Sequence, residues 1–295
     1  MINTSIINNV LNKKISEDLK FDILDDVNSV KSNTLTYCNN EQFFLKAINN
    51  PNITGIICSN ETSLSVKTDK TIIESKNPGF DFILLHNYFH SNSTNLEKSI
   101  IHPGANIHPT AFISEIGVII QDGVTIGPYS VVYSNVTIKS NTTVGSHSVL
   151  GCEDIEAKKS DLGYINAIHN GSLEIGNSCF VGSSVIISRG VYGKNTSIGD
   201  NTYISNNTII AHGVLIGRNC MILGCHICGS VCIGDNVRIN PKVVISNGLK
   251  IDDNVTILLG SVVITDVEKS KTVSGHYAIE HPKFLYKFVK LFGRV

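Results

Sequence analysis

Tryptophan is absent from this chain of 295 residues, methionine occurs twice, and aromatic residues make up only 7% of it. The interior must therefore be filled by aliphatic side chains, and a core rich in Ile and Val favours β structure. Charged residues are also scarce, at 17%, but the mean hydropathy of +0.11 is far from the polar composition of a disordered chain. We expect a folded protein with enough chain to enclose a substantial core.

Neither sign of charge dominates, because 24 Lys and Arg face 25 Asp and Glu and leave a formal charge of −1. Such a composition offers no basic surface for nucleic acid. Apolar runs of the ~18 residues that cross a bilayer are missing, and the N-terminal MINTSIINNVLNKK interrupts any signal-peptide core with Asn and Lys. We expect a cytoplasmic protein without a membrane span. Its eight cysteines, most of them beside Ile, Val or Gly, are expected to be small buried thiols.

A spacing of six residues runs through the middle of the chain. Aliphatic residues recur at every sixth position between residues 107 and 144, between 175 and 187, and from 198 to 263, with one seven-residue and one five-residue step. No helix has a period of six; this is the hexapeptide repeat, in which three hexads form a triangular coil of about 18 residues. Because one coil cannot bury its own Ile face, several must stack. Residues 101–267, without an insertion at 151–172, supply roughly eight or nine coils.

The repeat divides the chain into three predicted regions. Residues 1–98 lack it and show short apolar runs and helical spacing, which predict a small α/β domain with strands at 34–38, 53–59 and 71–75 and helices at 40–48 and 81–89. Residues 99–267 are predicted to form a left-handed parallel β-helix. The tail, 268–295, is predicted to contain a helix from Pro282 to Phe292. The fold class is therefore mainly β.

Two segments carry a closer resemblance. IGDNTYISNNTIIAHGVLIGRNCMILGCHICGSVCIG (198–234) and HNGSLEIGNSCFVGSSVIISRG (169–190) resemble the UDP-3-O-acylglucosamine N-acyltransferase family of the lipid A pathway and its relatives that acylate nucleotide-linked amino sugars. TLTYCNNEQFFLKAINNPNITGIICS and SKNPGF are similar to that family's nucleotide-recognising domain. The resemblance implies a homotrimer with active sites between neighbouring prisms, in which a sugar amine attacks an acyl thioester.

The resemblance also implies the catalytic residues. The family's general base is the His of an Ile-Ala-His segment, which is His212 here, and a neutral imidazole is suited to accept a proton near pH 7. The glycine whose amide stabilises the oxyanion matches Gly229. The two residues are 17 positions apart, one short coil, so Gly229 is expected almost directly above His212.

Further site residues are expected on the acceptor and donor sides. Asn77, Pro78 and Phe80 lie where the family presents the nucleotide base, although a turn with Phe80 in the core is an equal alternative. On the acceptor side we also expect His169, Arg189 and Asn206, and the donor side would comprise Gly229, Ile245 and Gly248. No metal or permanently bound cofactor is expected; acyl-CoA or acyl carrier protein would serve as co-substrate.

The chain departs from the lipid A pattern. Two aspartates of the family are Ser188 and Ser205 here, a second family His falls at Gly248, and the C-terminal portion is short. These departures favour transfer of a short acyl group, such as a 3-hydroxyacyl group, from CoA to a dTDP- or UDP-linked amino-deoxysugar for surface polysaccharide. The lipid A reaction is the second interpretation, and a non-catalytic β-solenoid is the third.

Two metal-based alternatives are weaker. Cys225-His226-Ile227-Cys228 has the composition of a zinc site, but Cys220 nearby occupies the small inward slot of its hexad, and a prism wall offers no loop on which four ligands converge. A zinc-dependent carbonic anhydrase needs a closely spaced His pair that this sequence lacks.

A non-catalytic solenoid of the ice-binding kind would need an exposed ladder of Thr, and no such ladder dominates here.

Overall fold

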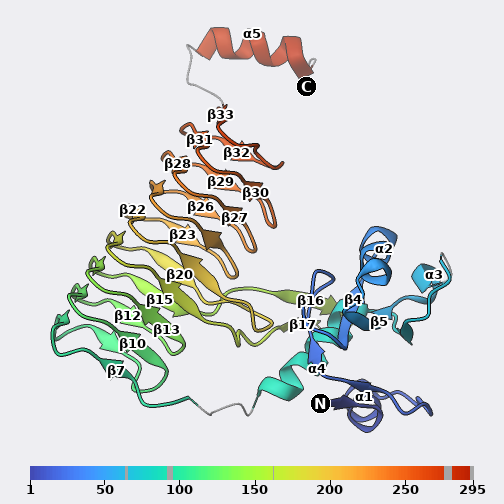
Figure 1. The fold of residues 1–295 in the computed structure, drawn as a ribbon. Helices are drawn as coiled ribbons and strands as arrows, with labels where there is room; N and C mark the ends of the chain where they lie inside the picture. Colours follow the sequence, from blue (N-terminus) through green and yellow to red (C-terminus); the bar gives the residue numbers. More distant parts are fainter. Residues whose placement is uncertain (64–65, 92–95, 162, 276–280, 293–295) are drawn as a thin grey trace.

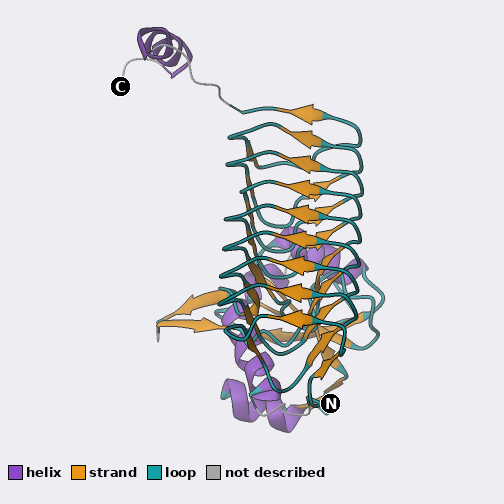
Figure 2. Cartoon of the chain, turned by 90° about the vertical axis from the view of Figure 1, so that its left-hand side faces the viewer, coloured by secondary structure: helices purple, strands orange, loops and turns teal. Residues whose placement is uncertain are grey.

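The computed structural model describes residues 1–63, 66–91, 96–161, 163–275 and 281–292. Its largest part is a left-handed parallel β-helix, seen as a regular stack of coils in Figures 1 and 2. The chain passes through three parallel sheets of eight, nine and eight strands in turn. The β-helix predicted from the six-residue period is confirmed.

Each sheet takes one strand from each coil. Sheet 1 contains β7 (Ile100–Ile101), β10 (Val118–Ile120), β13 (Val136–Ile138), β18 (Leu173–Ile175), β21 (Thr196–Ile198), β24 (Leu215–Ile216), β27 (Cys232–Ile233) and β30 (Lys250–Ile251). Sheet 2 contains β8 (Asn106–Ile107), β11 (Thr125–Ile126), β14 (Thr143–Val144), β19 (Phe180–Val181), β22 (Tyr203–Ile204), β25 (Met221–Ile222), β28 (Arg238–Ile239), β31 (Thr256–Ile257) and β33 (Thr272–Val273). Sheet 3 contains β9 (Phe112–Ile113), β12 (Val131–Val132), β15 (Val149–Cys152), β20 (Ile186–Ser188), β23 (Ile209–Ile210), β26 (His226–Ile227), β29 (Val244–Ile245) and β32 (Val262–Val263).

The hexad pattern explains the interior of the prism. The repeating aliphatic residue points inward and stacks on its counterpart in the next coil, as Ile210 does on Ile227. The inward slot four places later is also buried, and a polar residue there is hydrogen-bonded: Thr142 Oγ1 donates to the Gly176 carbonyl at 2.7 Å. Corners turn through left-handed residues such as Asn207, with φ 58°.

The ladder predicts a clear contrast in stability between neighbouring side chains. Ile257→Ala should lower the free energy of unfolding by about 2–5 kcal/mol, because Ile257 is 0% exposed and its loss leaves a cavity in the stack. The adjacent Thr256→Ala removes a half-buried side chain on the outer face and should cost less than about 1 kcal/mol. Urea unfolding followed by circular dichroism measures both, and equal costs would contradict an interior stabilised by its inward ladder.

The N-terminal part is a small α/β unit around a parallel sheet of order β3-β4-β5-β6. Its elements are β1 (Ile2–Asn3), α1 (Thr4–Leu11), β2 (Lys20–Phe21), β3 (Ile23–Leu24), β4 (Thr34–Cys38), α2 (Glu41–Asn49), β5 (Ile53–Cys58), α3 (Asn60–Ser63), β6 (Thr71–Glu74) and α4 (Pro78–His90). The expected strands and helices of this region are present within a few residues. The short elements β1, α1, β2, β3 and α3 were not predicted from the sequence.

The insertion at 151–172 forms the antiparallel hairpin β16 (Ala157–Ser160) and β17 (Gly163–Asn166). Figure 1 shows this hairpin reaching from the β-helix to the N-terminal part. Helix α4 packs against it, and His86 Nε2 lies 2.9 Å from the Ile168 carbonyl just after it. Asn87 Nδ2 donates to the Asn166 carbonyl at 2.8 Å. The hairpin is therefore a structural bridge between the two parts.

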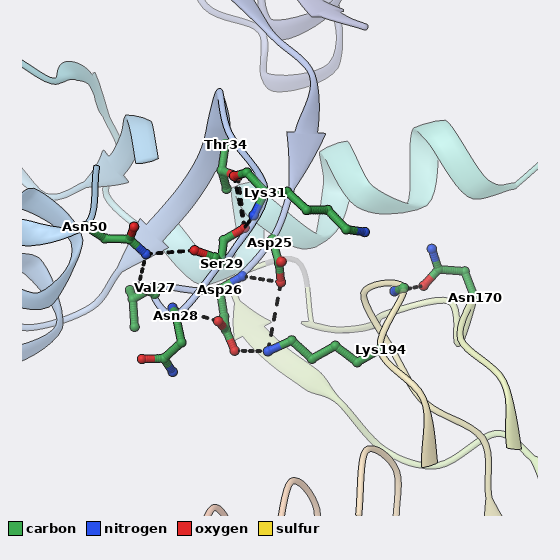
Figure 3. Close-up of polar contacts among 11 residues, drawn as sticks. Asp25, Asp26, Val27, Asn28, Ser29, Lys31, Thr34, Asn50, Asn170 and Lys194 are labelled. Carbon is green, nitrogen blue, oxygen red and sulfur yellow. Dashed lines mark hydrogen bonds and ion pairs between the residues drawn. The ribbon is translucent and has the colours of Figure 1, made fainter. Parts of the chain in front are cut away.

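A second bridge comes from the chain after β20. Lys194 Nζ forms an ion pair with Asp26 and lies 3.9 Å from Asp25 Oδ1, as Figure 3 shows. Beside it, the Gly193 amide donates to Asn170 Oδ1 at 2.8 Å.

At the other end of the chain, α5 (His281–Phe292) covers the predicted C-terminal helix. Within the described residues, no helix is both long and apolar enough to span a membrane.

Candidate active site

His212 lies at the corner that follows sheet 3. Its neighbours Ile210 and Val214 are 0% exposed and point into the prism. The His212 ring is turned instead toward the segment that enters the hairpin, where Asp154 contacts it. The residue is 8% exposed, so the ring is nearly closed off from solvent.

Two carboxylates face the two ring nitrogens of His212. Asp154 Oδ2 lies 3.2 Å from Nδ1, and Glu156 Oε2 lies 3.6 Å from Nε2. Burial lowers the pKa of His212, but the hydrogen bonds and charges of these carboxylates outweigh it and raise the pKa to about 9. The hydrogen bond from His212 in turn lowers the pKa of Asp154 to about 2. The ring is thus an imidazolium at neutral pH, which differs from the neutral imidazole that the sequence analysis expected.

His169 packs edge-on against His212, with ring centroids 5.3 Å apart. Its Nδ1 lies 3.0 Å from the Ala167 carbonyl, and its Nε2 accepts from the Asp154 amide at 3.3 Å. A carbonyl only accepts and an amide only donates, so the proton of His169 is on Nδ1 and the ring is neutral. Burial, followed by the charge of His212, lowers the pKa of His169 and favours the same state. His169 therefore holds Asp154 and His212 in place without adding a charge.

Gly229 lies against the His212 ring from the next coil. A Cβ atom added to Gly229 would stand 2.8 Å from His212 Nε2 and 3.0 Å from its Cε1. The Ser230 amide donates to the His212 carbonyl at 2.9 Å and fixes the two corners together. Among the described residues, the Gly229 amide has no hydrogen-bond acceptor. An unused backbone N–H thus lies next to the imidazole, the pairing that acyl transfer requires.

The residues expected at the nucleotide lie about a separate cavity. Asn77 and Phe80 line a hollow of about 970 Å³ together with Lys13 of the N-terminal part and Ser160 of the hairpin. Asn77 also caps α4, since its Oδ1 accepts from the Phe80 amide at 3.4 Å. Pro78 is buried as the first residue of the helix and does not line this cavity.

Two of the expected acceptor residues lie apart from the His212 ring. Arg189 is tied to Glu153 at 2.5 Å and to Ser134 at 3.3 Å, and it lines a second cavity of about 460 Å³ with His169. Asn206 follows sheet 2 at a different corner, and its Oδ1 accepts from the Ser183 amide at 2.7 Å. Asn206 therefore completes a turn of the coil and does not join the His212 cluster.

The donor-side prediction needs one correction. Ile245 is 0% exposed and belongs to the inward ladder, so its side chain cannot contact an acyl donor. Its hexad position already implied this orientation. Gly248 differs: its amide donates to the Gly229 carbonyl at 2.9 Å, and a Cβ added to it would meet no atom within 4 Å. The surface one coil beyond Gly229 is therefore open.

The sequence analysis missed Asp154 and Glu156, the two carboxylates that contact His212. Both lie in the run Glu153-Asp154-Ile155-Glu156, where the hexad pattern stops and the insertion begins. Three of these four residues are carboxylates, and they leave the prism two coils before the candidate base. This cluster was the sequence feature that could have indicated partners for His212. The spacing of 58 residues between Asp154 and His212 concealed it.

Comparison with known proteins supports the repeat. Residues 117–152 and 195–225 match the family model described as "Bacterial transferase hexapeptide (six repeats)". No curated protein sequence matches the chain.

Several solved structures are similar to the chain. LpxA from Acinetobacter baumannii has 27% identity over 65% of this chain and 76% of its own, with a TM-score of 0.45. GDP-perosamine N-acetyl transferase from Caulobacter crescentus has 14% identity over 75% and 81%, with a TM-score of 0.25. The acetyltransferase domain of PglB from Neisseria gonorrhoeae has 16% identity over 76% and 85%, with a TM-score of 0.23. With TM-scores below 0.5, these similarities do not carry over an activity. Within residues 117–152 and 195–225, the hexapeptide repeats are those that the bacterial transferase hexapeptide model describes.

Proposed function

We propose that this protein is an N-acyltransferase that moves a short acyl group, such as a 3-hydroxyacyl group, from CoA to the amine of a dTDP- or UDP-linked amino-deoxysugar. The observation that carries the proposal is the placement of the unused Gly229 amide against His212, which two carboxylates hold. No metal takes part. The products would serve surface polysaccharide synthesis, and substrates of this kind place the enzyme in the cytoplasm.

In the proposed mechanism the amine attacks the thioester carbonyl and forms a tetrahedral intermediate. His212 takes the amine proton at Nε2, because Asp154 occupies Nδ1. The Gly229 N–H donates to the oxyanion that develops on the former carbonyl oxygen. Collapse of the intermediate breaks the C–S bond, and the thiolate leaves with the proton that His212 returns. The amide product, free CoA and a regenerated base complete the balance.

The nucleotide of the acceptor would occupy the cavity of about 970 Å³ beside Asn77 and Phe80. Phe80 offers a half-buried aromatic surface there on which a base can stack. Lys13 and Lys76 are the lysines of the lining that the phosphates would contact, and Lys13 Nζ lies 3.5 Å from Asp81 Oδ2. The hairpin runs from this cavity to His212, so nucleotide and amine would lie along one path.

The proposal includes a homotrimer, for which the outer face of sheet 3 is the candidate interface. The first residue of each strand of this sheet faces outward, and only His226 among the eight is polar. The apolar members are Phe112, Val131, Val149, Ile186, Ile209, Val244 and Val262. An apolar stripe of this kind marks an interaction surface. His212 lies directly beyond its edge, where a neighbouring copy would complete the cleft.

The decisive experiment is incubation of the protein with UDP- and dTDP-amino sugars against acetyl-CoA, 3-hydroxyacyl-CoA and acyl carrier protein donors, with products identified by mass. A short-chain CoA product supports the proposal. A product formed only from a long-chain carrier-protein donor would instead indicate the lipid A reaction. Absence of any product across the panel would favour a non-catalytic solenoid.

The raised pKa of His212 predicts the pH dependence of that reaction. Because the imidazolium loses its proton with a pKa of about 9, roughly one molecule in a hundred holds the neutral base at pH 7. We expect kcat/KM to rise from pH 7 to about pH 9 and then level. Asp154→Asn removes a charge that raises this pKa, so its rising limb should move to lower pH. Since the substrate amine titrates identically for both enzymes, an unmoved limb would exclude His212 as the titrating base.

A further inference from the structure

The atom that would take the substrate proton already has a neighbour. His212 Nε2 lies 3.6 Å from Glu156 Oε2, and Glu156 stands at the start of the hairpin. Its side chain is 22% exposed, so the carboxylate is partly withdrawn from water beside the ring. A negative charge at this distance favours the protonated imidazole.

Glu156 is in turn held by Lys158, whose Nζ lies 3.1 Å from Oε1. Lys158 is fixed by the N-terminal part. Its methylene groups pass 3.2 Å from the position that a Cβ of Gly79 would take at the start of α4, so the Lys158 side chain packs closely against this glycine. Its ammonium group also interacts with the Tyr37 hydroxyl of β4. A chain of contacts thus runs from the N-terminal sheet through the hairpin to the base.

We propose that Glu156 is a positioning residue that sets the charge of His212, and that the N-terminal part keeps Glu156 in place through Lys158. The catalytic meaning of this arrangement rests on the proposed function; the arrangement itself does not. Glu156 lies beside Nε2 but does not itself exchange the substrate proton, and Lys158 acts through Glu156. Their role is to fix how tightly the ring holds its proton.

The other titratable groups described near His212 do not place a negative charge at Nε2. Asp154 occupies the opposite ring nitrogen, His169 is neutral, and Glu153 is engaged by Arg189. The Tyr192 hydroxyl is buried beside the Glu156 carboxylate. Tyr192 is uncharged at neutral pH, since burial, ahead of nearby charges, raises its pKa. Glu156 is therefore the one carboxylate, among the described residues, that lies against Nε2.

Lys158 can affect the His212 pKa by holding Glu156 in place or by its own positive charge, and the two roles predict opposite changes of that pKa when Lys158 is replaced. The positive charge of Lys158 by itself disfavours a proton on His212, so deleting that charge with Glu156 still in place would raise the His212 pKa. If Lys158 instead anchors Glu156, deleting it frees the carboxylate from Nε2 and the pKa falls. The sign of the change decides between them.

The experiment is a histidine-selective NMR titration of the full-length protein, with the His212 signal assigned by its absence in His212→Gln. Glu156→Gln should lower the His212 pKa by about one pH unit or more, and Lys158→Met should lower it as well. Lys159→Met is the matched control, because Lys159 is the next residue of the same strand and lies over the Tyr164 ring, 5.8 Å from its centroid. It should leave the titration unchanged.

An unchanged His212 pKa in Glu156→Gln, or a rise in Lys158→Met, would overturn the inference. Circular dichroism of each variant verifies that the β-helix is intact. If Lys158→Met does not fold, Tyr37→Phe takes its place, because it removes only the hydroxyl that interacts with Lys158. This variant should also lower the His212 pKa. The titration needs no substrate. Failure of the acyl-transfer panel with a shifted His212 signal would therefore refute the proposed function alone, and the reverse result would refute only this inference.

Discussion

His212→Ala is expected to lower kcat by ~10²-fold or more, because the proton of the attacking amine then has no acceptor at Nε2. The fold should persist, since the side chain lies outside the prism and takes no part in its ladder. Product formation with the substrate pair selected from the panel measures the effect. Size-exclusion chromatography and circular dichroism report whether the assembly survives.

His147→Asn is the control for this substitution. His147 is also a corner histidine, but it lies at the corner before sheet 3 and stacks on Tyr129, with ring centroids 5.1 Å apart. Its φ of 58° is left-handed, which Asn tolerates. This variant should keep wild-type turnover. Near-normal turnover in His212→Ala would place the base on another residue.

Gly229→Ala is expected to reduce kcat by about 10²-fold or more, an effect comparable to the loss of an oxyanion donor. The added Cβ would stand 2.8 Å from His212 Nε2, so the ring must move away from both the amide and Glu156. The atom in the way is a side chain and not backbone, so the coil itself need not shift. The midpoint of thermal unfolding should therefore change little while turnover falls.

Cys228→Ala provides the matched control for Gly229→Ala. Cys228 is the preceding residue, and the hydrogen bond from its amide to the Ile245 carbonyl at 3.0 Å does not need the thiol. The turnover of the Cys228→Ala variant should stay close to that of the wild type. Full activity in Gly229→Ala would mean that the ring and this amide do not act together.

The sequence predicts the β-helix well because its signal is strictly periodic. Each coil buries the same hexad positions, so the position of a residue such as Ile210 within its hexad is enough to predict that it is buried. The same rule exposes the error at Ile245, whose inward position excludes contact with a donor. In contrast, α1 was missed because Asn8 and Asn9 interrupt its apolar residues and only Ile7 is buried.

The relative position of Gly229 and His212 could be predicted from the coil, whereas the residues where the coil is interrupted could not. The spacing of one coil placed Gly229 over His212, as the structure shows. Asp154 and Glu156 belong to a segment without a period, and their contacts depend on how the hairpin folds back from the N-terminal part. No local pattern encodes that path, which is determined by tertiary contacts such as that between Lys158 and Gly79.

Both excursions of the chain from the β-helix, at 153–172 and 189–195, leave the stack after strands of sheet 3. The ladder above and below them continues in register, as the pairing of β15 with β20 and of β20 with β23 shows. The excursions can therefore change in length or sequence without altering the pairing of the coils. If the proposed function holds, a different acceptor can be accommodated by changes in the hairpin alone, while the inward ladder that stabilises the fold is unchanged.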